Sequence, residues 1–402
     1  HLTSDELNRR AIADRTKRAA DERMKVRSTN PQRPWTDYIV TSERSGRTYR
    51  VALRSFKQGE CYCTCPDFRT NKLRTCKHIL HVQSKVRKRF SEAKLRSPYR
   101  RKRVSVGISY GPERGLLFHL PYKSDEKIRE IVDGADEKLI TDANDAMTRI
   151  AALEHAGHDV TIYPDADAFI QRQLIQHHVR KECDSIRENP ANHPLRTDLL
   201  TATLRPYQLD GIAFVAGAGR AMLADDMGLG KTIQGIGVAE LLSRLADIKR
   251  VLIVSPATLK TQWRNEIVRF SDRTTQIVLG NGAERVDQYR SDTFFTICNY
   301  EQVLRDLTAI EEISWDLIIL DEGQRIKNWE SKTSNVIRQL QSPFRLVLSG
   351  TPLENRLGDL FTVTRFVDEN RLGPAYEFFH RHHVVDERGK TLGYHRLDEL
   401  RD

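Results

Sequence analysis

The chain has 402 residues, of which 39% are hydrophobic and 30% are charged, so it is long enough for two or three domains with sizeable cores. Its longest apolar runs, such as Val251–Val254 and Leu317–Leu320, are too short to span a bilayer, which excludes a membrane-spanning function. The N-terminus lacks the apolar stretch of a signal peptide and the initiator Met, which indicates a fragment or a processed chain. A net charge of +10 and a pI near 9.3 favour a polyanionic partner.

The first part of the chain predicts a helix and a hairpin. Residues 1–34 are highly charged, with few apolar positions, which is typical of a solvent-facing basic helix; Pro31 and Pro34 would end it. Residues 38–42 and 48–55 alternate apolar and polar side chains on either side of the turn sequence ERSGR. This alternation predicts a two-stranded hairpin.

A metal-binding pattern follows the hairpin. Four of the six cysteines lie between residues 61 and 76, and clustered cysteines in an intracellular chain favour a metal over disulfides. Cys63 and Cys65 are separated by ten residues from Cys76 and His78, so a hairpin end supplies two thiolates and a helix start supplies the other two ligands. This set closes a tetrahedral Zn²⁺ site with no open position, so the expected role is structural. Two further side chains are alternatives for a ligand position: Cys61 and His81.

Positive charge is concentrated just after this pattern. Residues 85–103 read KVRKRFSEAKLRSPYRRKR, with Glu92 as the single acid. One interpretation is a solvated helix face and linker; the other is a patch that follows DNA phosphates. The candidate DNA-contacting side chains on the helix are Lys85, Arg87, Lys88 and Arg89. Docking to a protein is the alternative role for this region.

Residues 104–195 predict a small α/β module, with strands at VSVGISY, GLLFHLP and DVTIYPD and helices between them. No chemistry is evident in this module, so a scaffold or arm is expected, with recognition of a DNA substrate as the alternative. From residue 196 the pattern changes, because short apolar strands (AMLAD, RVLIVSP, FFTICN, DLIIL and RLVLSG) alternate with helical segments. This alternation predicts a doubly wound parallel sheet.

A phosphate-binding loop lies in this last region. Ala221 to Gln234 reads as a strand, a glycine-bearing turn, Gly-Lys-Thr and a helix start. Two glycines let the backbone approach a triphosphate closely, and the helix points its positive end at the phosphates. Lys231 would reach the β- and γ-phosphates, and the Thr232 hydroxyl would ligate Mg²⁺. The first glycine of the general pattern falls at Asp225, so the match is imperfect.

An acidic pair completes the expected nucleotide site. SWDLIILDEGQ is an apolar strand that ends in Asp321 and Glu322. Asp321 would hold Mg²⁺ through water, and Glu322 would orient and deprotonate the attacking water. An acidic turn after a core strand is the alternative reading of a lone Asp-Glu.

The motifs together resemble the Swi/Snf family of superfamily-two helicase-like ATPases. LRPYQLDGIAFV is similar to the adenine-reading Q motif, and LADDMGLGKTIQ to motif I, in which this family accepts Asp225. VLIVSPATLKTQWRNEI, with Pro256 and Trp263, TICNYEQV, DEGQ and LVLSGTPLENRLGDLF are similar to motifs Ia, Ib, II and III. Motif II usually ends in His, whereas Gln324 stands here; Gln donates and accepts hydrogen bonds as a neutral His does. CTCPDFRTNKLRTCKHILHV resembles the SWIM zinc finger.

The resemblance implies a set of site residues. Catalytic roles fall to Lys231, Asp321, Glu322 and Gln324. Nucleotide binding falls to Arg205, Gln208, Asp226, Met227, Gly228, Leu229, Gly230, Lys231, Thr232 and Ile233. Contacts to one DNA strand fall to Ser255, Thr258 and Asn299, for which helix capping or a turn bond is the alternative. Coupling of the nucleotide to motif III is assigned to its central residues, Ser349, Gly350 and Thr351.

The expected fold is therefore α/β, with a doubly wound parallel RecA-like sheet preceded by a small α/β module and a ββα zinc finger. The expected segments are a basic helical segment (1–34), a SWIM-type zinc finger (35–90), a basic linker (91–103), the accessory module (104–195) and the first RecA-like ATPase lobe (196–402).

The resemblance implies an ATP hydrolase that translocates on double-stranded DNA and uses ATP, Mg²⁺ and Zn²⁺. Family members need a second lobe whose arginines are worth about 10³–10⁵ in rate, so this chain alone is expected to hydrolyse ATP poorly. Expected partners are duplex DNA and a DNA-bound protein or polymerase, with a monomeric chain in the cytoplasm at the nucleoid of a bacterium. A non-catalytic DNA- or protein-binding fragment is the alternative, and an RNA helicase is a weaker one.

Overall fold

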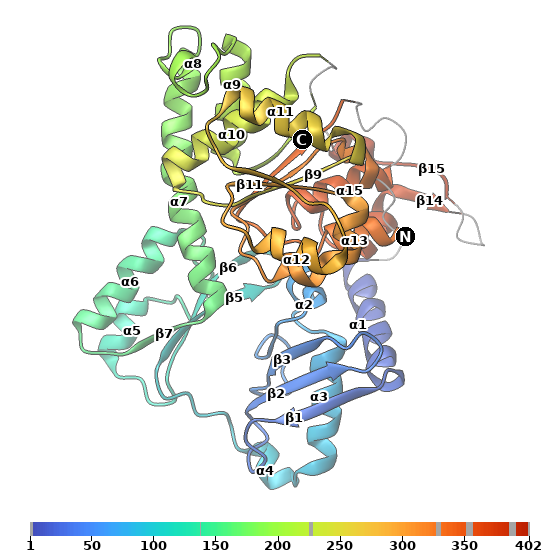
Figure 1. The fold of residues 1–402 in the computed structure, drawn as a ribbon. Coiled ribbons are helices and arrows are strands. Elements are labelled where there is room, and N and C mark those ends of the chain that lie inside the picture. Colours follow the sequence, from blue (N-terminus) through green and yellow to red (C-terminus); the bar gives the residue numbers. More distant parts are fainter. Residues whose placement is uncertain are drawn as a thin grey trace. The chain divides into compact units, whose positions relative to one another are not determined.

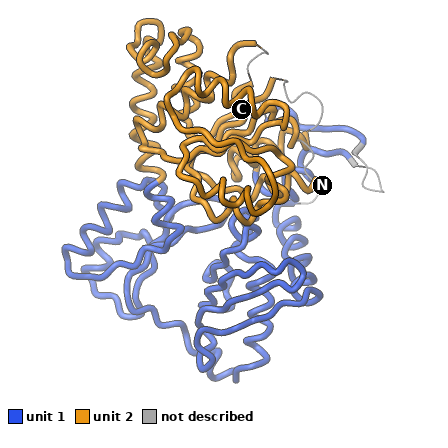
Figure 2. The backbone as a smooth tube through the Cα atoms, in the orientation of Figure 1, with its two compact units in different colours: residues 1–171, 373–402 blue, residues 172–372 orange. Residues whose placement is uncertain are grey.

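The computed structural model describes residues 3–136, 138–224, 228–326, 331–350, 357–385 and 391–400. The chain forms two compact units (Figure 2): unit 1 contains residues 1–171 and 373–402, and unit 2 contains residues 172–372. Among the described helices, none is both long enough and apolar enough to cross a membrane.

A four-stranded antiparallel sheet and its helices form the first part of unit 1 (Figure 1). Its strands lie in chain order: β1 (Met24–Ser28), β2 (Asp37–Ser42), β3 (Thr48–Ala52) and β4 (Tyr62–Cys63). The helices are α1 (Ser4–Asp21), α2 (Pro66–Thr70), α3 (Lys77–Arg89) and α4 (Glu92–Arg96). The predicted hairpin corresponds to β2 and β3. Buried side chains of the sheet, such as Val40 and Val51, pack with Ile79 and Val82 of α3 in one hydrophobic core.

The prediction of a helix through residues 1–34 is wrong beyond Asp21. Thr3 caps α1 in a capping box with Glu6, and the helix ends where Glu22 turns extended. Residues 24–28 then pair along their whole length with β2. Only Met24 of β1 is fully buried, so the sequence of this strand has too little apolar alternation to reveal it.

The remainder of unit 1 contains the elements predicted for residues 104–162. Three strands form a sheet in which β5 lies between an antiparallel and a parallel neighbour: β5 (Val104–Tyr110), β6 (Arg114–His119) and β7 (Val160–Ile162). The helices are α5 (Glu126–Val132) and α6 (Ala143–His155), and α7 (Pro164–Glu188) begins after β7.

The two units divide the chain at places that the sequence does not indicate. The first boundary, at residue 171, falls inside α7 rather than near residue 195. Residues 373–402 cluster with unit 1 rather than with the lobe, where they were expected. They form α16 (Ala375–His382), β14 (His383–Val385), β15 (Thr391–Tyr394) and the 3₁₀ turn η3 (Leu397–Leu400). Within unit 1, the Tyr376 hydroxyl lies 2.9 Å from Asn8 Oδ1 and 3.2 Å from the Asn71 carbonyl.

Unit 2 contains a six-stranded parallel sheet, so the predicted fold class is confirmed. The strand order is β10-β11-β9-β12-β13-β8, and every neighbouring pair is parallel. The strands are β8 (Arg220–Leu223), β9 (Val251–Ser255), β10 (Thr275–Ile277), β11 (Phe295–Asn299), β12 (Leu317–Leu320) and β13 (Phe344–Leu348). The helices are α8 (Leu195–Asp198), α9 (Pro206–Ala218), α10 (Lys231–Ala246), α11 (Lys260–Phe270), α12 (Gly282–Arg290), α13 (Tyr300–Glu311), α14 (Lys332–Ile337) and α15 (Leu357–Val367), with 3₁₀ turns η1 (Ala257–Leu259) and η2 (Gly323–Ile326).

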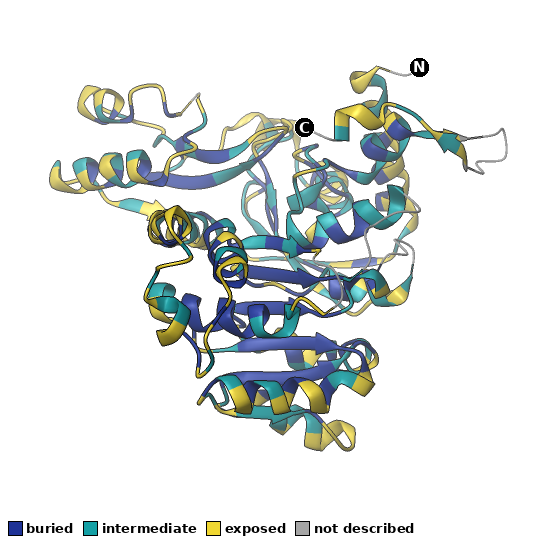
Figure 3. Cartoon of the chain, turned by 90° about the horizontal axis from the view of Figure 1, so that it is seen from above, coloured by how far each residue is buried: buried dark blue, intermediate teal, exposed yellow. Residues whose placement is uncertain are grey.

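Helices cover both faces of this sheet, because alternate strand residues enter two separate cores. Ile253 and Ile319 pack with Ile212, Ile236 and Trp263 from α9, α10 and α11. Their sequence neighbours Leu252 and Ile318 pack in the second core, to which α12, α13, α14 and α15 contribute. The central strands are therefore buried throughout (Figure 3). Strands buried on both faces read as continuous apolar runs, which is why the sequence revealed them.

Candidate nucleotide and metal sites

The phosphate loop of unit 2 follows β8 and leads into α10. Gly228 and Gly230 have φ of +88° and +80°, a backbone region that L side chains rarely adopt. Gly230 caps α10 without a side-chain hydrogen bond, so the positive N-terminal end of the helix, beginning at Lys231, follows directly on the loop. Asp226 and Met227, two of the predicted nucleotide-binding residues, lie outside the described residues.

The Q-motif residues contact this loop. The Gln208 side chain accepts a hydrogen bond from the Arg205 N–H at 3.0 Å and donates to the Leu229 carbonyl at 3.4 Å. The Tyr207 hydroxyl donates to the same carbonyl at 3.2 Å. A Cβ at Gly230 would lie 2.8 Å from Gln208 Nε2, so the glycine also makes room for this side chain. The start of α9 is thereby joined to the loop.

Asp321 lies at the end of β12, at the sheet edge from which the phosphate loop also departs. Both β8 and β12 pair with β13 in parallel, so the ends of these strands meet there. Burial raises the pKa of the Asp321 carboxyl, while a hydrogen bond from Trp263 and the charge of Lys231 lower it. The shared edge therefore places Asp321 on the same side of the sheet as the loop that leads to Lys231.

Glu322, Gln324 and Ser349 form a hydrogen-bonded relay. The Gln324 amide donates to Glu322 Oε2, and the Ser349 hydroxyl donates to Gln324 Oε1 at 3.1 Å. Gln324 therefore joins motif II to motif III with one donor and one acceptor, which the sequence had allowed but could not establish. Gly350 follows Ser349 and is half-buried. Thr351, the third predicted coupling residue, lies outside the described residues.

The backbone at this relay is constrained. Glu322 has φ of +52°, a left-handed conformation that is uncommon for a residue with a side chain. Such conformations cost about 1–3 kcal/mol and gather at functional sites. The next residue, Gly323, is required sterically, because a Cβ there would lie 2.3 Å from Val347 Cγ1.

The three residues predicted to contact a DNA strand differ in exposure and in their hydrogen bonds. Thr258 in η1 is exposed and can meet a ligand. Ser255 is fully buried, and its hydroxyl donates to the Pro256 carbonyl at 3.3 Å, so the turn-bond alternative describes it better. Asn299 caps α13, accepting from the Gln302 N–H at 2.8 Å in a capping box. The Asn-x-x-Gln spacing is a known capping signature that could have indicated this role.

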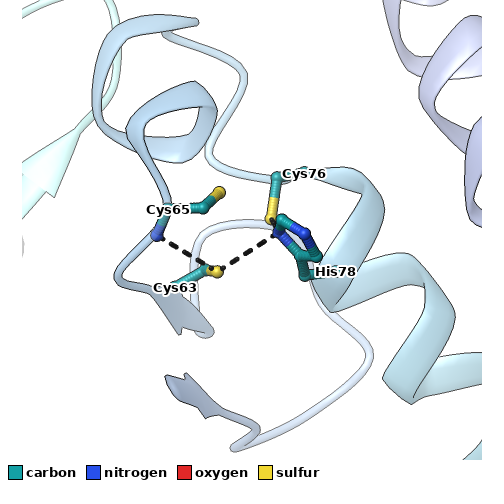
Figure 4. Close-up of side chains that lie close together, drawn as sticks. All are labelled: Cys63, Cys65, Cys76 and His78. Atoms are coloured by element: carbon teal, nitrogen blue, oxygen red, sulfur yellow. Dashed lines mark hydrogen bonds between the residues drawn. The ribbon is translucent and has the colours of Figure 1, made fainter. Parts of the chain in front are cut away.

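The four predicted zinc ligands converge in unit 1 (Figure 4). The ligand atoms of Cys63, Cys65, Cys76 and His78 all lie within 4.8 Å of one another, and all four residues are buried. The His78 Nδ1 atom lies 3.9 Å from the sulfurs of Cys63 and of Cys76. The Phe68 N–H donates to the Cys65 sulfur at 3.4 Å, as is usual for a thiolate that binds a metal. The donor set fits Zn²⁺.

Neither alternative ligand belongs to this cluster. The Cys61 thiol is buried and donates to the Ser55 carbonyl at 3.2 Å. The His81 Nδ1 atom lies 2.7 Å from the Ala19 carbonyl, to which it donates. Within the cluster, burial raises the pKa of the Cys63 and Cys76 thiols. A bound metal would offset this cost, because coordination deprotonates thiols.

The four basic residues predicted on the following helix are all exposed. They occupy the second half of α3: Lys85, Arg87, Lys88 and Arg89. Val82 and Val86 lie on the opposite, buried face of the helix and pack into the core of unit 1. The Arg87 guanidinium stacks 4.4 Å from the centroid of the Phe56 ring, which holds one of the charges at the surface. The arrangement presents a row of cations to solvent.

The sequence did not indicate two polar contacts made by side chains of α11. The Trp263 indole donates to Asp321 Oδ2 at 2.8 Å. Lys260, although buried, donates to the Val278 carbonyl at 2.9 Å and lies 3.3 Å from Gln302 Oε1. A Trp flanked by Gln262 and Arg264 and a lone Lys carry no signal of such partners, which are brought together only by the parallel sheet.

A glycine-bearing loop after β8 and an acidic residue after β12, on strands that flank β13 in a parallel sheet, are the arrangement typical of a P-loop ATPase domain. The comparisons with known proteins identify the domain further. Residues 207–401 match the family model of the SNF2-related domain. These residues are therefore an SNF2-related domain, homologous to Swi2/Snf2 ATPases.

Characterised relatives share this region. The chain is 33% identical over 224 residues to the human DNA repair and recombination protein RAD54B, covering 49% of this chain and 25% of that protein. It is 32% identical over 203 residues to the Saccharomyces cerevisiae ISWI chromatin-remodeling complex ATPase ISW1, and the match covers 48% of this chain and 17% of that protein. The Sulfolobus solfataricus SWI2/SNF2 ATPase core in complex with dsDNA is 29% identical, covers 50% of this chain and 43% of that chain, and gives a TM-score of 0.45. This chain thus spans less than half the length of each.

Proposed function

We propose that unit 2 binds Mg²⁺·ATP and uses its hydrolysis to move along double-stranded DNA. The observation that carries this proposal is that the glycine-bearing loop before Lys231 and the carboxylate of Asp321 lie at the same edge of the parallel sheet, within a domain homologous to Swi2/Snf2 ATPases. The relatives named for DNA repair and chromatin remodelling support DNA as the partner. The motif set favours a duplex, because it resembles the Swi/Snf pattern rather than that of RNA helicases.

The residues present fit a magnesium ion and a triphosphate. The Thr232 hydroxyl and the Asp321 carboxylate are hard oxygen donors, which Mg²⁺ prefers, and the ion would neutralise charge on the phosphates. Lys231 and the first N–H groups of α10 bind the phosphate oxygens. Glu322 takes a proton from the attacking water, and Gln324 fixes the orientation of its carboxylate.

Motif III is positioned to respond to this chemistry. Ser349 follows β13 and donates to Gln324, so a change in the orientation of Glu322 reaches the segment after β13 through two hydrogen bonds. The exposed Thr258 on η1 contacts the backbone of one DNA strand in the proposed complex. Its hydroxyl would bond a phosphate oxygen, which positions the protein without reading the base sequence.

A comparison of polynucleotides tests the proposed function. We expect the protein to bind an ATP analogue in the presence of Mg²⁺, and its ATPase rate to rise with duplex DNA more than with single-stranded DNA or RNA of equal length. Stimulation by RNA alone would overturn the duplex assignment. A protein that binds DNA but never binds nucleotide would support the alternative, a non-catalytic DNA- or protein-binding fragment.

For unit 1 we propose a structural zinc finger, similar to SWIM fingers, whose following helix contacts DNA phosphates. Zn²⁺ bound by the Cys63–His78 cluster would fix the start of α3 against β4, since the cluster takes ligands from both. The exposed cations near the end of the helix then face solvent in a fixed row. A DNA-bound protein such as a polymerase is a further proposed partner.

Neutralising the α3 cations is expected to weaken the salt dependence of DNA binding. Changing Lys85, Arg87, Lys88 and Arg89 to Gln should lower the slope of log K against log salt by up to about 0.9 for each phosphate that these side chains neutralise. The measurement is a titration of a fluorescent duplex at several salt concentrations. Four exposed cations of the accessory module supply a matched control: Lys123, Lys127, Arg129 and Lys138. Equal slopes for the α3 variant and the unmodified protein would favour protein docking instead.

A further inference from the structure

Asp321 accepts three hydrogen bonds. Its Oδ2 atom accepts from the Trp263 indole N–H at 2.8 Å, and its Oδ1 atom accepts from the Glu322 backbone N–H at 2.9 Å. Its main-chain carbonyl accepts from the Tyr300 hydroxyl at 2.7 Å. The plane of the carboxylate is therefore fixed by one donor on each oxygen. Each oxygen keeps a further lone pair, which is available to a metal ion or to a metal-bound water.

Of these donors, only the indole is a side chain that reaches the carboxylate. The terminal torsion of an Asp side chain has broad minima, so the Glu322 N–H alone would leave the second oxygen unfixed. Trp263 is 1% exposed, which excludes water as a competing partner of Oδ2 on that side. Asp321 itself is 9% exposed, so little solvent is available to replace the indole donor.

Trp263 is itself well anchored. It lies on α11 and belongs to the core formed with α9 and α10. A Cβ placed on Gly235 of α10 would lie 3.1 Å from Trp263 Cη2, so the ring packs directly against the helix that begins at the phosphate loop. The indole thus spans from the phosphate-loop helix to the end of β12. Its partner lies 58 residues away in sequence.

We propose that Trp263 is a positioning residue for the metal: its indole N–H holds the Asp321 carboxylate in the orientation that Mg²⁺ requires when nucleotide is bound. The inference rests on the proposed ATP-binding function. Groups that orient a metal ligand in this way usually change metal affinity by about 10–100-fold when removed. Trp263 contacts neither nucleotide nor DNA in this role and is not a catalytic residue.

The chain provides a matched control for testing this role. Trp315 is also buried, at 4% exposure, in the core on the other face of the same sheet. Its indole donates at 3.0 Å to the Ile310 main-chain carbonyl, which has no part in the nucleotide site. Trp263→Phe and Trp315→Phe each remove one indole N–H and leave an aromatic ring in a core, so their general effects on stability are comparable.

The experiment measures Mn²⁺ binding to the whole chain by electron paramagnetic resonance, with a non-hydrolysable ATP analogue present. Binding of the analogue without metal is measured separately. We expect Trp263→Phe to weaken Mn²⁺ binding by about tenfold or more while metal-free binding of the analogue stays within about twofold. Trp315→Phe should change neither quantity. A merely structural role for Trp263 would lower both quantities together and would overturn the inference, as would unchanged Mn²⁺ binding in Trp263→Phe.

Failure of this inference is distinguishable from failure of the proposed function. If the unmodified chain binds no metal and nucleotide, the proposed function fails; if it binds both and Trp263→Phe binds them equally well, only the role of Trp263 fails. Should Trp263→Phe not fold, the unmodified chain supplies the test by nuclear magnetic resonance. The Trp263 indole N–H signal should shift when Mg²⁺ is added with the analogue, while that of Trp315 stays; an unmoved Trp263 signal would refute the inference.

Discussion

Replacing Glu322 with Gln should lower the ATP hydrolysis rate by about 10²–10⁴ while nucleotide binding is retained, because a general base contributes a factor of this size. The substitution is nearly isosteric, and the new amide oxygen still accepts the hydrogen bond from Gln324. The relay to Ser349 therefore persists while the proton acceptor is removed. The measurement is a single-turnover assay with protein in excess over ATP, reported as a ratio to the unmodified chain on the same DNA.

A second carboxylate in the same domain serves as the control for this variant. Glu301 lies on α13 and is exposed. Glu301→Gln should leave both the hydrolysis rate and nucleotide binding unchanged. If Glu322→Gln retains the unmodified rate, Glu322 is not the base. If it loses nucleotide binding instead, the carboxylate has a role in holding the ligand rather than in activating water.

Loss of zinc should unfold the finger of unit 1 and leave the ATPase lobe intact. Structural zinc sites bind with about 10–16 kcal/mol of apparent free energy at neutral pH, and this energy is largely folding energy. We therefore expect each chain to bind one Zn²⁺, and we expect Cys76→Ser to abolish zinc binding. By hydrogen exchange, residues 62–90 should lose protection while β9 and β12 of unit 2 keep theirs.

Cys61 provides the control for the zinc prediction. Its thiol is buried and bonds the Ser55 carbonyl, but it lies outside the four-residue cluster. A serine hydroxyl preserves that donor, so Cys61→Ser should retain the zinc and the protection of α3. Zinc retained by Cys76→Ser, or absent from Cys61→Ser, would show that the ligand set is wrong.

Much of the fold of unit 2 could be predicted because its central strands are buried on both sides. Leu317–Leu320 and Val251–Val254 read as uninterrupted apolar runs, and glycines mark the loop before α10. The phosphate loop, Asp321 and the Cys63–His78 cluster could also be predicted from the sequence. Their function depends on residue type and short spacing, which a sequence displays directly.

Features that depend on distant partners were not predictable. Strand β1 has one buried residue, so its pairing with β2 decides its conformation rather than its own pattern. Residues 373–402 join unit 1 through contacts such as that of Tyr376 with Asn8, 368 residues apart. The bond from Trp263 to Asp321 likewise requires the packed sheet. Ser255 shows the converse case, because a motif position predicts a DNA contact where the fold buries the hydroxyl.

The central claim is that Lys231 and Asp321 act on one metal-bound triphosphate. The most direct measurement is a crystal structure of the protein with Mn²⁺ and a non-hydrolysable ATP analogue, in which anomalous scattering locates the metal. The account predicts the Mn²⁺ peak between the Thr232 hydroxyl and the Asp321 carboxylate, with the γ-phosphate beside the Lys231 ammonium. A nucleotide bound elsewhere, or a metal remote from Asp321, would contradict it.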